Sequence, residues 1–209
     1  HLEVFVTPLV AAGHRVIAFD LPSHNDSDPG QLAPRRTTIV ECAEAVRAFV
    51  GEHGPARAIV AHSLGAKAAA LAVARGADIE RLVFLAPMGD FSWYLDIFAD
   101  RHGFGPRTLG GVRRRLDRRL KMPLFDTDIV RVAATLDAAP PLLVIHDPDD
   151  PDSPYGMSEE LVGVWPGSTL LTTRGLGRLA HYRILRHRPA IDAGVDFVGR
   201  AAPCVAPAN

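Results

Sequence analysis

Ser63 has the surroundings expected of a catalytic nucleophile. It follows a short apolar run and begins a stretch of small residues, with Ala61 two positions before it and Gly65 two positions after it. A tight strand-to-helix turn strains the backbone at its central residue and needs small neighbours at those two positions. Such a turn would direct the start of the helix and the N–H of Leu64 at an oxyanion that forms beside the serine. The spacing therefore predicts a nucleophilic serine, although A-x-S-x-G also arises by chance where alanine-rich helices begin.

A serine hydroxyl needs a base to take its proton, and the base needs a carboxylate to orient it. Acidic side chains are concentrated at 147–152, directly after the apolar run 141–146, and His181 lies between the last predicted strand and the last predicted helix. The acidic run could also be a solvated loop or a calcium loop, but Pro151 stands where a calcium loop needs an oxygen ligand. A single loop histidine is more often a surface residue. We expect no metal site.

The segment around Ser63 resembles the nucleophile turn of the α/β-hydrolase family, G-x-S-x-G, with Ala61 in place of the first glycine. The loop 20–27 is similar to the D-x-P-G-H-G-x-S pattern of the same family, with Ser23 and Asn25 where the family has glycine. We assign that loop a structural role. The resemblance extends over essentially the whole chain and implies a bacterial serine esterase or lipase-like hydrolase that needs no cofactor.

In the resembled family the catalytic residues follow in the order serine, acid, histidine. The run from His146 to Pro154 is similar to the family pattern H-G-x-x-D-x-x-V-P, which implies that Asp150 is the acid, with Asp149 as the second candidate. The resemblance therefore gives the Ser63 nucleophile an acid downstream of it.

The run 175–185, GLGRLAHYRIL, resembles the G-L-G-H-x-R-I-L ending of a bacterial subgroup of the family. The match implies that His181 is the base, and it requires three extra residues, Arg178 to Ala180, before the histidine. His187 is the second candidate, at a less suitable place in the motif. Together the matches imply a triad of Ser63, Asp150 and His181.

Strand-like and helical segments alternate along the chain, and most of the strands read as apolar throughout. That pattern predicts an α/β fold with a mostly parallel sheet and helices on both faces. We expect strands at 14–21, 57–61, 81–86, 141–146 and 168–172, and helices at 2–12, from 38 to about 53, and at 66–75, 158–165 and 189–200. Thr38 and Glu41 have the spacing of a capping box.

About fifty residues between 87 and 140 interrupt this alternation, and they read as helical. We therefore expect one catalytic domain made of residues 1–86 and 141–209, with 87–140 as a helical cap. Residues 101–121 contain eight Lys or Arg and one acid, Asp117. A solvated helix face, with Leu116 and Leu120 pointing inward, explains this better than a surface for anions or membranes. Aromatic residues near the start of the cap could line an apolar pocket or form the core of the cap.

The chain has 209 residues, a net charge of −1 and two cysteines, Cys42 and Cys204. A chain so close to neutral argues against a nucleic-acid binder, and two cysteines form neither a disulfide framework nor a zinc site on their own. No apolar run is long enough to span a membrane, and no signal peptide is visible. We expect a cytoplasmic enzyme with a small-molecule substrate, and the sequence leaves its oligomeric state open.

The chain begins at His1 and leads directly into a predicted helix, whereas the resembled family has earlier strands and a His-Gly loop that supplies a second oxyanion donor. We therefore expect a shortened hydrolase without these N-terminal strands. Loss of one oxyanion donor typically costs about 10²–10³ in rate. The alternatives are a catalytically impaired or non-catalytic protein of this fold, and another chemistry on the same fold, such as that of a haloperoxidase or a lyase.

Overall fold

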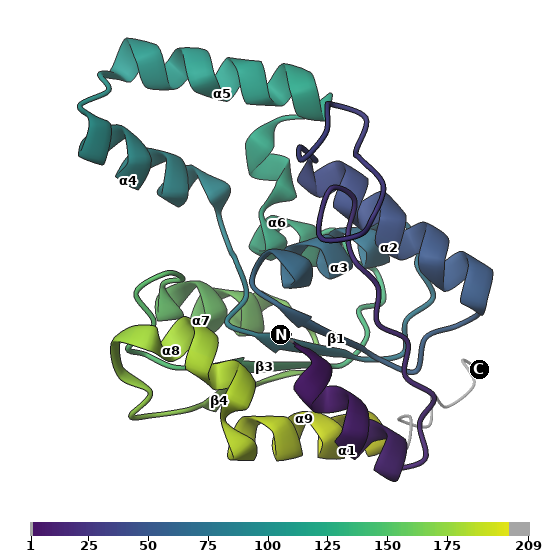
Figure 1. Ribbon diagram of the computed structural model, residues 1–209. Coiled ribbons are helices and arrows are strands. Elements are labelled where there is room, and N and C mark those ends of the chain that lie inside the picture. Colours follow the sequence, from purple (N-terminus) through teal and green to yellow (C-terminus); the bar gives the residue numbers. More distant parts are fainter. Residues whose placement is uncertain (1, 201–209) are drawn as a thin grey trace.

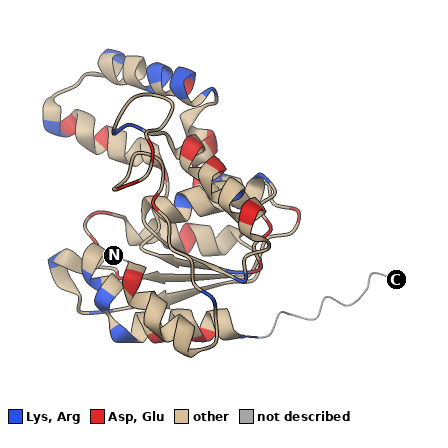
Figure 2. Cartoon of the chain, turned by 45° about the vertical axis from the view of Figure 1, so that its right-hand side comes forward, with Lys and Arg blue, Asp and Glu red and all other residues tan. Residues whose placement is uncertain are grey.

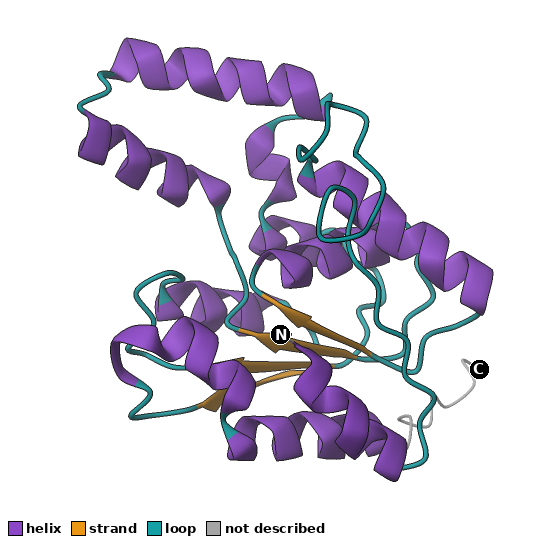
Figure 3. Ribbon diagram, viewed as in Figure 1, coloured by secondary structure: helices purple, strands orange, loops and turns teal. Residues whose placement is uncertain are grey.

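Four parallel strands form the centre of the molecule in the computed structural model, which describes residues 2–200 (Figure 3). They lie side by side in the order β1-β2-β3-β4. Ile59 pairs with Leu82, Leu82 with Leu142, and Leu142 with Ser168. The strands are β1 (Ile59–His62), β2 (Leu82–Leu85), β3 (Leu142–His146) and β4 (Ser168–Thr172). Both inner strands are buried along their whole length, which explains their unbroken apolar sequence.

Helices cover both faces of this sheet (Figure 1). One face packs against α2 (Ile39–His53), α3 (Leu64–Ala74), α6 (Ile129–Ala133) and α7 (Tyr155–Val164). The other face packs against η1 (Leu2–Phe5), α1 (Val6–Ala11), α8 (Ala180–Arg183), η4 (Ile184–Arg186) and α9 (Arg188–Gly199). The expected α/β architecture is confirmed. Because the strands are parallel, the loops that follow them meet at one edge of the sheet.

The capping box predicted for the start of α2 is present. The Thr38 hydroxyl accepts a hydrogen bond from the Glu41 N–H at 3.1 Å, and the Glu41 carboxylate accepts one from the Thr38 N–H at 2.7 Å. These bonds satisfy two donors that the first turn of a helix otherwise leaves free. The four residues 38–41 are therefore enough to predict where α2 starts.

The residues between β2 and β3 are helical, as expected. They form α4 (Phe91–His102), α5 (Pro106–Leu120), η2 (Leu124–Thr127) and α6. In Figure 1, α4 and α5 make a hairpin that stands away from the sheet, whereas α6 packs close to α3. Gly103 ends α4 in the left-handed conformation, and Pro106 occupies the first turn of α5. Both residues are typical of these helix positions.

The strand expected at 14–21 is wrong. Residues 14–20 form neither a helix nor a strand, and they pair with no strand in the described part of the chain. A β-branched and aromatic sequence makes an extended backbone favourable, but only a neighbouring strand can complete its hydrogen bonds. Ile17 and Phe19 are 43% and 40% exposed, and the Phe19 ring stacks on Phe49 of α2 with 4.2 Å between ring centroids.

The loop that follows this segment adopts the backbone that its resemblance implied. Ser23 and Asn25, which stand where the family pattern has glycine, have φ angles of 64° and 41°. The Asn25 side chain donates a hydrogen bond to the Asp20 carboxylate at 2.8 Å, and the Ser27 hydroxyl donates one to the Asp20 carbonyl at 2.6 Å. The bond from its side chain holds Asn25 in a conformation that sterics normally disfavour, and the Ser23 hydroxyl is held by bonds to the Arg36 carbonyl and the Gly30 N–H at 3.0 and 2.7 Å.

Cys42 is buried as a free thiol, and Cys204 and His1 lie outside the described residues. Among the described helices, none has both the length and the apolar character that crossing a bilayer requires.

Candidate active site

Ser63 occupies the turn between β1 and α3 with φ 50° and ψ −118°, which is strained for any residue with a side chain. Three backbone hydrogen bonds hold it there. Its N–H donates to the Leu85 carbonyl at 3.1 Å, and its carbonyl accepts from Ala66 and Met88 at 3.1 and 3.2 Å. A Cβ built on Gly65 would lie 3.9 Å from the Cβ of Ala61. Larger side chains at these two positions would collide, as the spacing predicted.

Asp150 and His181 form a buried hydrogen-bonded pair, although 31 residues separate them in the chain. The distance from His181 Nδ1 to Asp150 Oδ2 is 2.7 Å, and their residues are 5% and 8% exposed. An ionised carboxylate only accepts hydrogen bonds, so Nδ1 carries the proton and the lone pair of Nε2 remains for a base. This is the tautomer that general-base catalysis requires.

Asp150 accepts three further hydrogen bonds. Its Oδ1 accepts from the N–H groups of Asp152 and Ser153 at 2.8 and 3.0 Å, and its Oδ2 accepts from His146 Nε2 at 3.2 Å. Burial alone would raise the pKa of the Asp150 carboxyl, but the bonds from His146, His181 and Ser153 outweigh burial and hold this pKa well below its usual range. Asp150 is therefore ionised at neutral pH.

His146 is a further component of this site. The motif at 146–154 begins at this residue and predicts no role for its side chain. Its ring is fully buried, with Nε2 on Asp150 and Nδ1 at 2.7 Å from the Ser158 hydroxyl on α7. In a neutral imidazole that donates from Nε2 to the carboxylate, Nδ1 accepts from that hydroxyl. A histidine at the end of a wholly apolar strand was the available signal, since a buried imidazole needs partners for both nitrogens.

His62 connects the serine turn to the Asp150–His181 pair. Its Nε2 donates to the His181 carbonyl at 2.9 Å, and the two imidazole rings lie 4.6 Å apart between centroids. Burial, followed by the nearby charge of His181, lowers the pKa of His62 to about 4, so the ring is neutral at pH 7. Since His62 directly precedes Ser63, these contacts place His181 next to the turn. Within the described residues the Ser63 hydroxyl makes no hydrogen bond, and the Ser63 side chain is half-buried.

His181 lies on a short helix and not in the open loop that was expected. The three extra residues, 178–180, extend over η3 (Gly177–Leu179) and the first residue of α8. The extra length is thus taken up as helical turns, and His181 still reaches Asp150. Leu64, the expected oxyanion donor, is the first residue of α3, where a backbone N–H has no partner inside the helix.

The second candidates for acid and base lie in different surroundings. Asp149 is exposed, and its carboxylate has no hydrogen bond to the residues that the structure describes, whereas its backbone N–H donates to the Asp147 carboxylate at 3.0 Å. His187 is the residue before α9, and its Nδ1 is buried without a hydrogen bond in the part of the chain that the structure describes. Asp147 joins the ends of β3 and β4, because its other carboxylate oxygen accepts from the Thr173 hydroxyl at 3.0 Å.

Asp150, Asp152 and His181 each offer one ligand atom, and these atoms lie within 4.8 Å of one another. The Asp150 carboxylate and His181 Nδ1 already satisfy each other, and Asp152 is exposed. Hydrogen bonding therefore accounts for this cluster.

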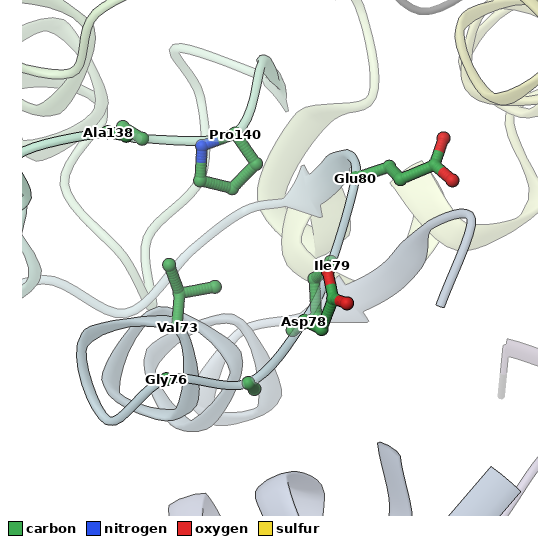
Figure 4. A pocket seen from close by; sticks show the side chains of 9 residues that line it. Val73, Gly76, Asp78, Ile79, Glu80, Ala138 and Pro140 are labelled. Carbon is green, nitrogen blue, oxygen red and sulfur yellow. The ribbon is translucent and has the colours of Figure 1, made fainter. Parts of the chain in front are cut away.

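Two hollows lie near the sheet. One, of about 220 Å³, is lined by residues after β2 and on α4, α6 and α7, including Asp90, Trp93 and Met157. Beside it, the buried Lys67 of α3 donates to the Gly89 carbonyl at 2.7 Å, and burial lowers its pKa to about 8. The other hollow, of about 510 Å³, is lined by Val73, residues 76–80 and residues 138–140 (Figure 4). These residues precede β2 and β3, so that hollow lies at the opposite edge of the sheet from Ser63.

The fold agrees with the comparisons to known proteins. The sequence model of the alpha/beta hydrolase family matches residues 1–199, so the chain belongs to the α/β-hydrolase family. No curated protein matches the chain significantly in sequence.

Solved structures show the same fold at low sequence identity. A monoacylglycerol lipase of Paleococcus ferrophilus superposes with a TM-score of 0.67 at 20% identity, over 94% of this chain and 87% of that one. A bromoperoxidase of Bacillus anthracis has a TM-score of 0.64 at 16% identity, over 94% and 86% of the two chains. The mouse alpha/beta hydrolase domain-containing protein 10 has a TM-score of 0.64 at 16% identity, over 94% and 81%. At these identities the likeness concerns the fold alone.

Proposed function

We propose that this protein is a serine hydrolase that cleaves a small-molecule ester or a related carbonyl compound through an acyl-enzyme. The observation that carries the proposal is the buried Asp150–His181 pair at 2.7 Å beside a serine on a strained turn. In this assignment Ser63 is the nucleophile, His181 the general base and Asp150 the residue that orients His181. We assign residues 1–86 and 141–209 to the catalytic core and the helical insertion 87–140 to its cap, of which α6 packs against the core.

The residues account for each step of such a reaction. Ser63 Oγ attacks the substrate carbonyl while His181 Nε2 takes its proton, and the Leu64 N–H donates to the oxyanion. The imidazolium then gives its proton to the leaving alcohol, which leaves an acyl group on Ser63. Water, activated by the same nitrogen, hydrolyses that ester and restores the serine. The Asp150 carboxylate stabilises the imidazolium in both half-reactions.

Labelling with a fluorophosphonate probe tests this proposal. The probe phosphonylates an activated serine, so we expect the parent protein to be labelled and Ser63→Ala to be unlabelled. His181→Gln should be labelled far more slowly, whereas the matched change His187→Gln should keep the parent rate. A folded parent protein that resists the probe, or equal effects of the two histidine changes, would contradict the assignment.

A non-catalytic protein of the same fold is the competing hypothesis. It is motivated by the Ser63 hydroxyl, which makes no hydrogen bond within the described residues. Bonds to a catalytic base are often long in unliganded enzymes and shorten when substrate binds. Failure of the parent protein to react with the probe or to turn over short-chain esters would favour this hypothesis.

A further inference from the structure

The basic residues of this chain are concentrated in one segment. Residues 101–121 carry eight Lys or Arg and one acid, whereas the rest of the chain has fifteen Lys or Arg and twenty-three Asp or Glu. The net charge is nearly zero because a basic segment and an acidic remainder cancel, so positive and negative charge are separated along the chain. The segment comprises the end of α4, the turn after it, all of α5 and Lys121. Figure 2 shows the positions of Lys and Arg, in blue on the cartoon, gathered along α5 on the hairpin that stands away from the sheet.

Most of these cations face solvent without a counter-charge. Arg113 pairs with Asp96 at 2.6 Å. Within the described residues the other seven form no ion pair, and all are exposed: Arg101, Arg107, Arg114, Arg115, Arg118, Arg119 and Lys121. The spacing of the five exposed arginines on α5 places them on one side of that helix, opposite the half-buried or buried Leu109, Val112, Leu116 and Leu120. The helix therefore presents a continuous cationic face.

The outer end of the same hairpin exposes large apolar side chains. Ile97, Phe98 and Phe104 are 36%, 50% and 40% exposed. The Phe98 ring lies 5.7 Å from that of Phe104 and 4.3 Å from that of His102, between centroids. These rings form an aromatic tip at the turn between α4 and α5. Transfer of these apolar rings from water to an apolar environment lowers the free energy, so the tip favours contact with an apolar phase.

We propose that the α4–α5 hairpin docks on the surface of a bilayer that contains anionic lipids. The cationic face of α5 matches the phosphate headgroups, and the aromatic tip matches the acyl region just below them. Peripheral proteins bind membrane surfaces through two contributions, electrostatic attraction to anionic lipids and burial of apolar side chains. The cationic face supplies the first contribution and the aromatic tip supplies the second. The acidic excess elsewhere orients the molecule, because it repels the remainder of the protein from the same surface. A nucleic acid would engage the cations but provides no acyl region for the tip.

Vesicle sedimentation of the full chain tests the proposal. We expect the parent protein to bind vesicles of phosphatidylcholine and phosphatidylglycerol in equal parts, and not vesicles of phosphatidylcholine alone. Each basic residue near such a surface is worth about a fivefold factor in partitioning. The variant Arg114→Gln/Arg115→Gln/Arg118→Gln/Arg119→Gln removes four such residues and should therefore lower partitioning by roughly six hundredfold.

The matched control changes four exposed arginines outside the hairpin. Arg15→Gln/Arg174→Gln/Arg178→Gln/Arg186→Gln alters the net charge equally, and none of these side chains has an ion pair or hydrogen bond within the described residues. It should retain at least half of the parent's partitioning. An equal loss in both variants would show that only net charge matters, and would overturn the proposal.

A second variant leaves the arginines unchanged and distinguishes binding to a bilayer from binding to other polyanions. Phe98→Ser/Phe104→Ser should weaken vesicle binding by roughly tenfold, because it removes the tip from the acyl region. The same change should leave binding to a DNA duplex unaltered. Tight DNA binding without vesicle binding, or vesicle binding that neither hairpin variant weakens, would overturn the proposal.

Discussion

Asp150 accepts four hydrogen bonds, two from imidazoles and two from backbone N–H groups of its own loop. This arrangement keeps the carboxylate ionised although it is buried, because every donor stabilises the charged form. It also fixes the carboxylate in position, since four bonds to its two oxygens oppose its rotation. The hydrogen bond from Nδ1 to this fixed carboxylate restrains the orientation of the His181 imidazole. Positioning of the proposed base thus depends on residues from β3, α7 and the loop after β3.

Asp150→Asn tests this role of the carboxylate. An amide in its place can donate to His181 Nδ1, which favours the tautomer with its proton on Nε2 and removes the base. We expect the rate of fluorophosphonate labelling to fall by roughly 10³–10⁴-fold. The neighbouring Asp149→Asn, which changes an exposed carboxylate by the same one atom, should stay within about threefold of the parent. Equal rates for the two variants would be inconsistent with Asp150 as the acid.

Among the helices, α9 shows how closely the elements that carry the site are packed. A Cβ built on Gly194 would lie 2.9 Å from the Phe5 ring and 3.4 Å from Val83. The helix therefore rests directly on η1 and on β2, and only glycine leaves room for that approach. Three short helices, η3, α8 and η4, lie between β4 and α9 in the chain, and α8 contains His181. Their position depends on α9 being seated on the sheet.

Two glycine changes with opposite expected signs test this packing. Gly194→Ala should lower the free energy of unfolding by about 1–2 kcal/mol, because the cost of overpacking exceeds the gain in helix propensity. Gly163→Ala, on the exposed side of α7 where an added Cβ meets no atom within 4 Å, should raise it by about 0.5–1 kcal/mol. Urea denaturation measures both. Stabilisation by Gly194→Ala would mean that Phe5 moves aside freely.

At the scale of the whole molecule, the stability of the fold depends on pH through His62. The folded protein keeps this histidine neutral at pH values at which the unfolded chain protonates it. Burial, followed by the nearby charge of His181, lowers the pKa of His62 to about 4 from 6.5. Between these two values the unfolded chain binds a proton at His62 that the folded chain does not bind. The free energy of unfolding therefore falls as the pH drops from about 6.5 to about 4. The low pKa of Asp150 adds a further loss only below about pH 4.

We expect this loss of stability to decrease by about 2 kcal/mol in His62→Asn, which has no titrating ring and keeps a side-chain donor for the His181 carbonyl. Urea denaturation at pH 6.5 and at pH 4 measures the difference. The exposed His24→Asn serves as the matched control and should show the same loss as the parent. An unchanged loss in His62→Asn would mean that His62 is accessible to protons in the folded protein.

The sequence by itself determined the features that depend on near neighbours. The serine turn follows from Ala61 and Gly65, the start of α2 from the Thr38–Glu41 capping box, and the parallel sheet from apolar runs between helices. Steric exclusion and local hydrogen bonds act over a few residues, so a pattern of a few residues is enough to reveal them. The resemblance of 146–154 to the family pattern selected Asp150 as the candidate acid, and its place directly after a strand agrees with the edge of the sheet at which Ser63 lies.

Only the tertiary structure decided what depends on distant partners. The segment 14–21 has a strand-like sequence, but it pairs with no strand in the described residues and forms neither a helix nor a strand. The second imidazole on Asp150 could not be foreseen, because His146 and Ser158 meet only when α7 packs on β3. The same holds for the seven exposed cations of the hairpin, whose composition favoured an ordinary solvated face. Hydrogen-bond partners, burial and charge separation are set by the packing of elements far apart in the chain, and no local pattern encodes that packing.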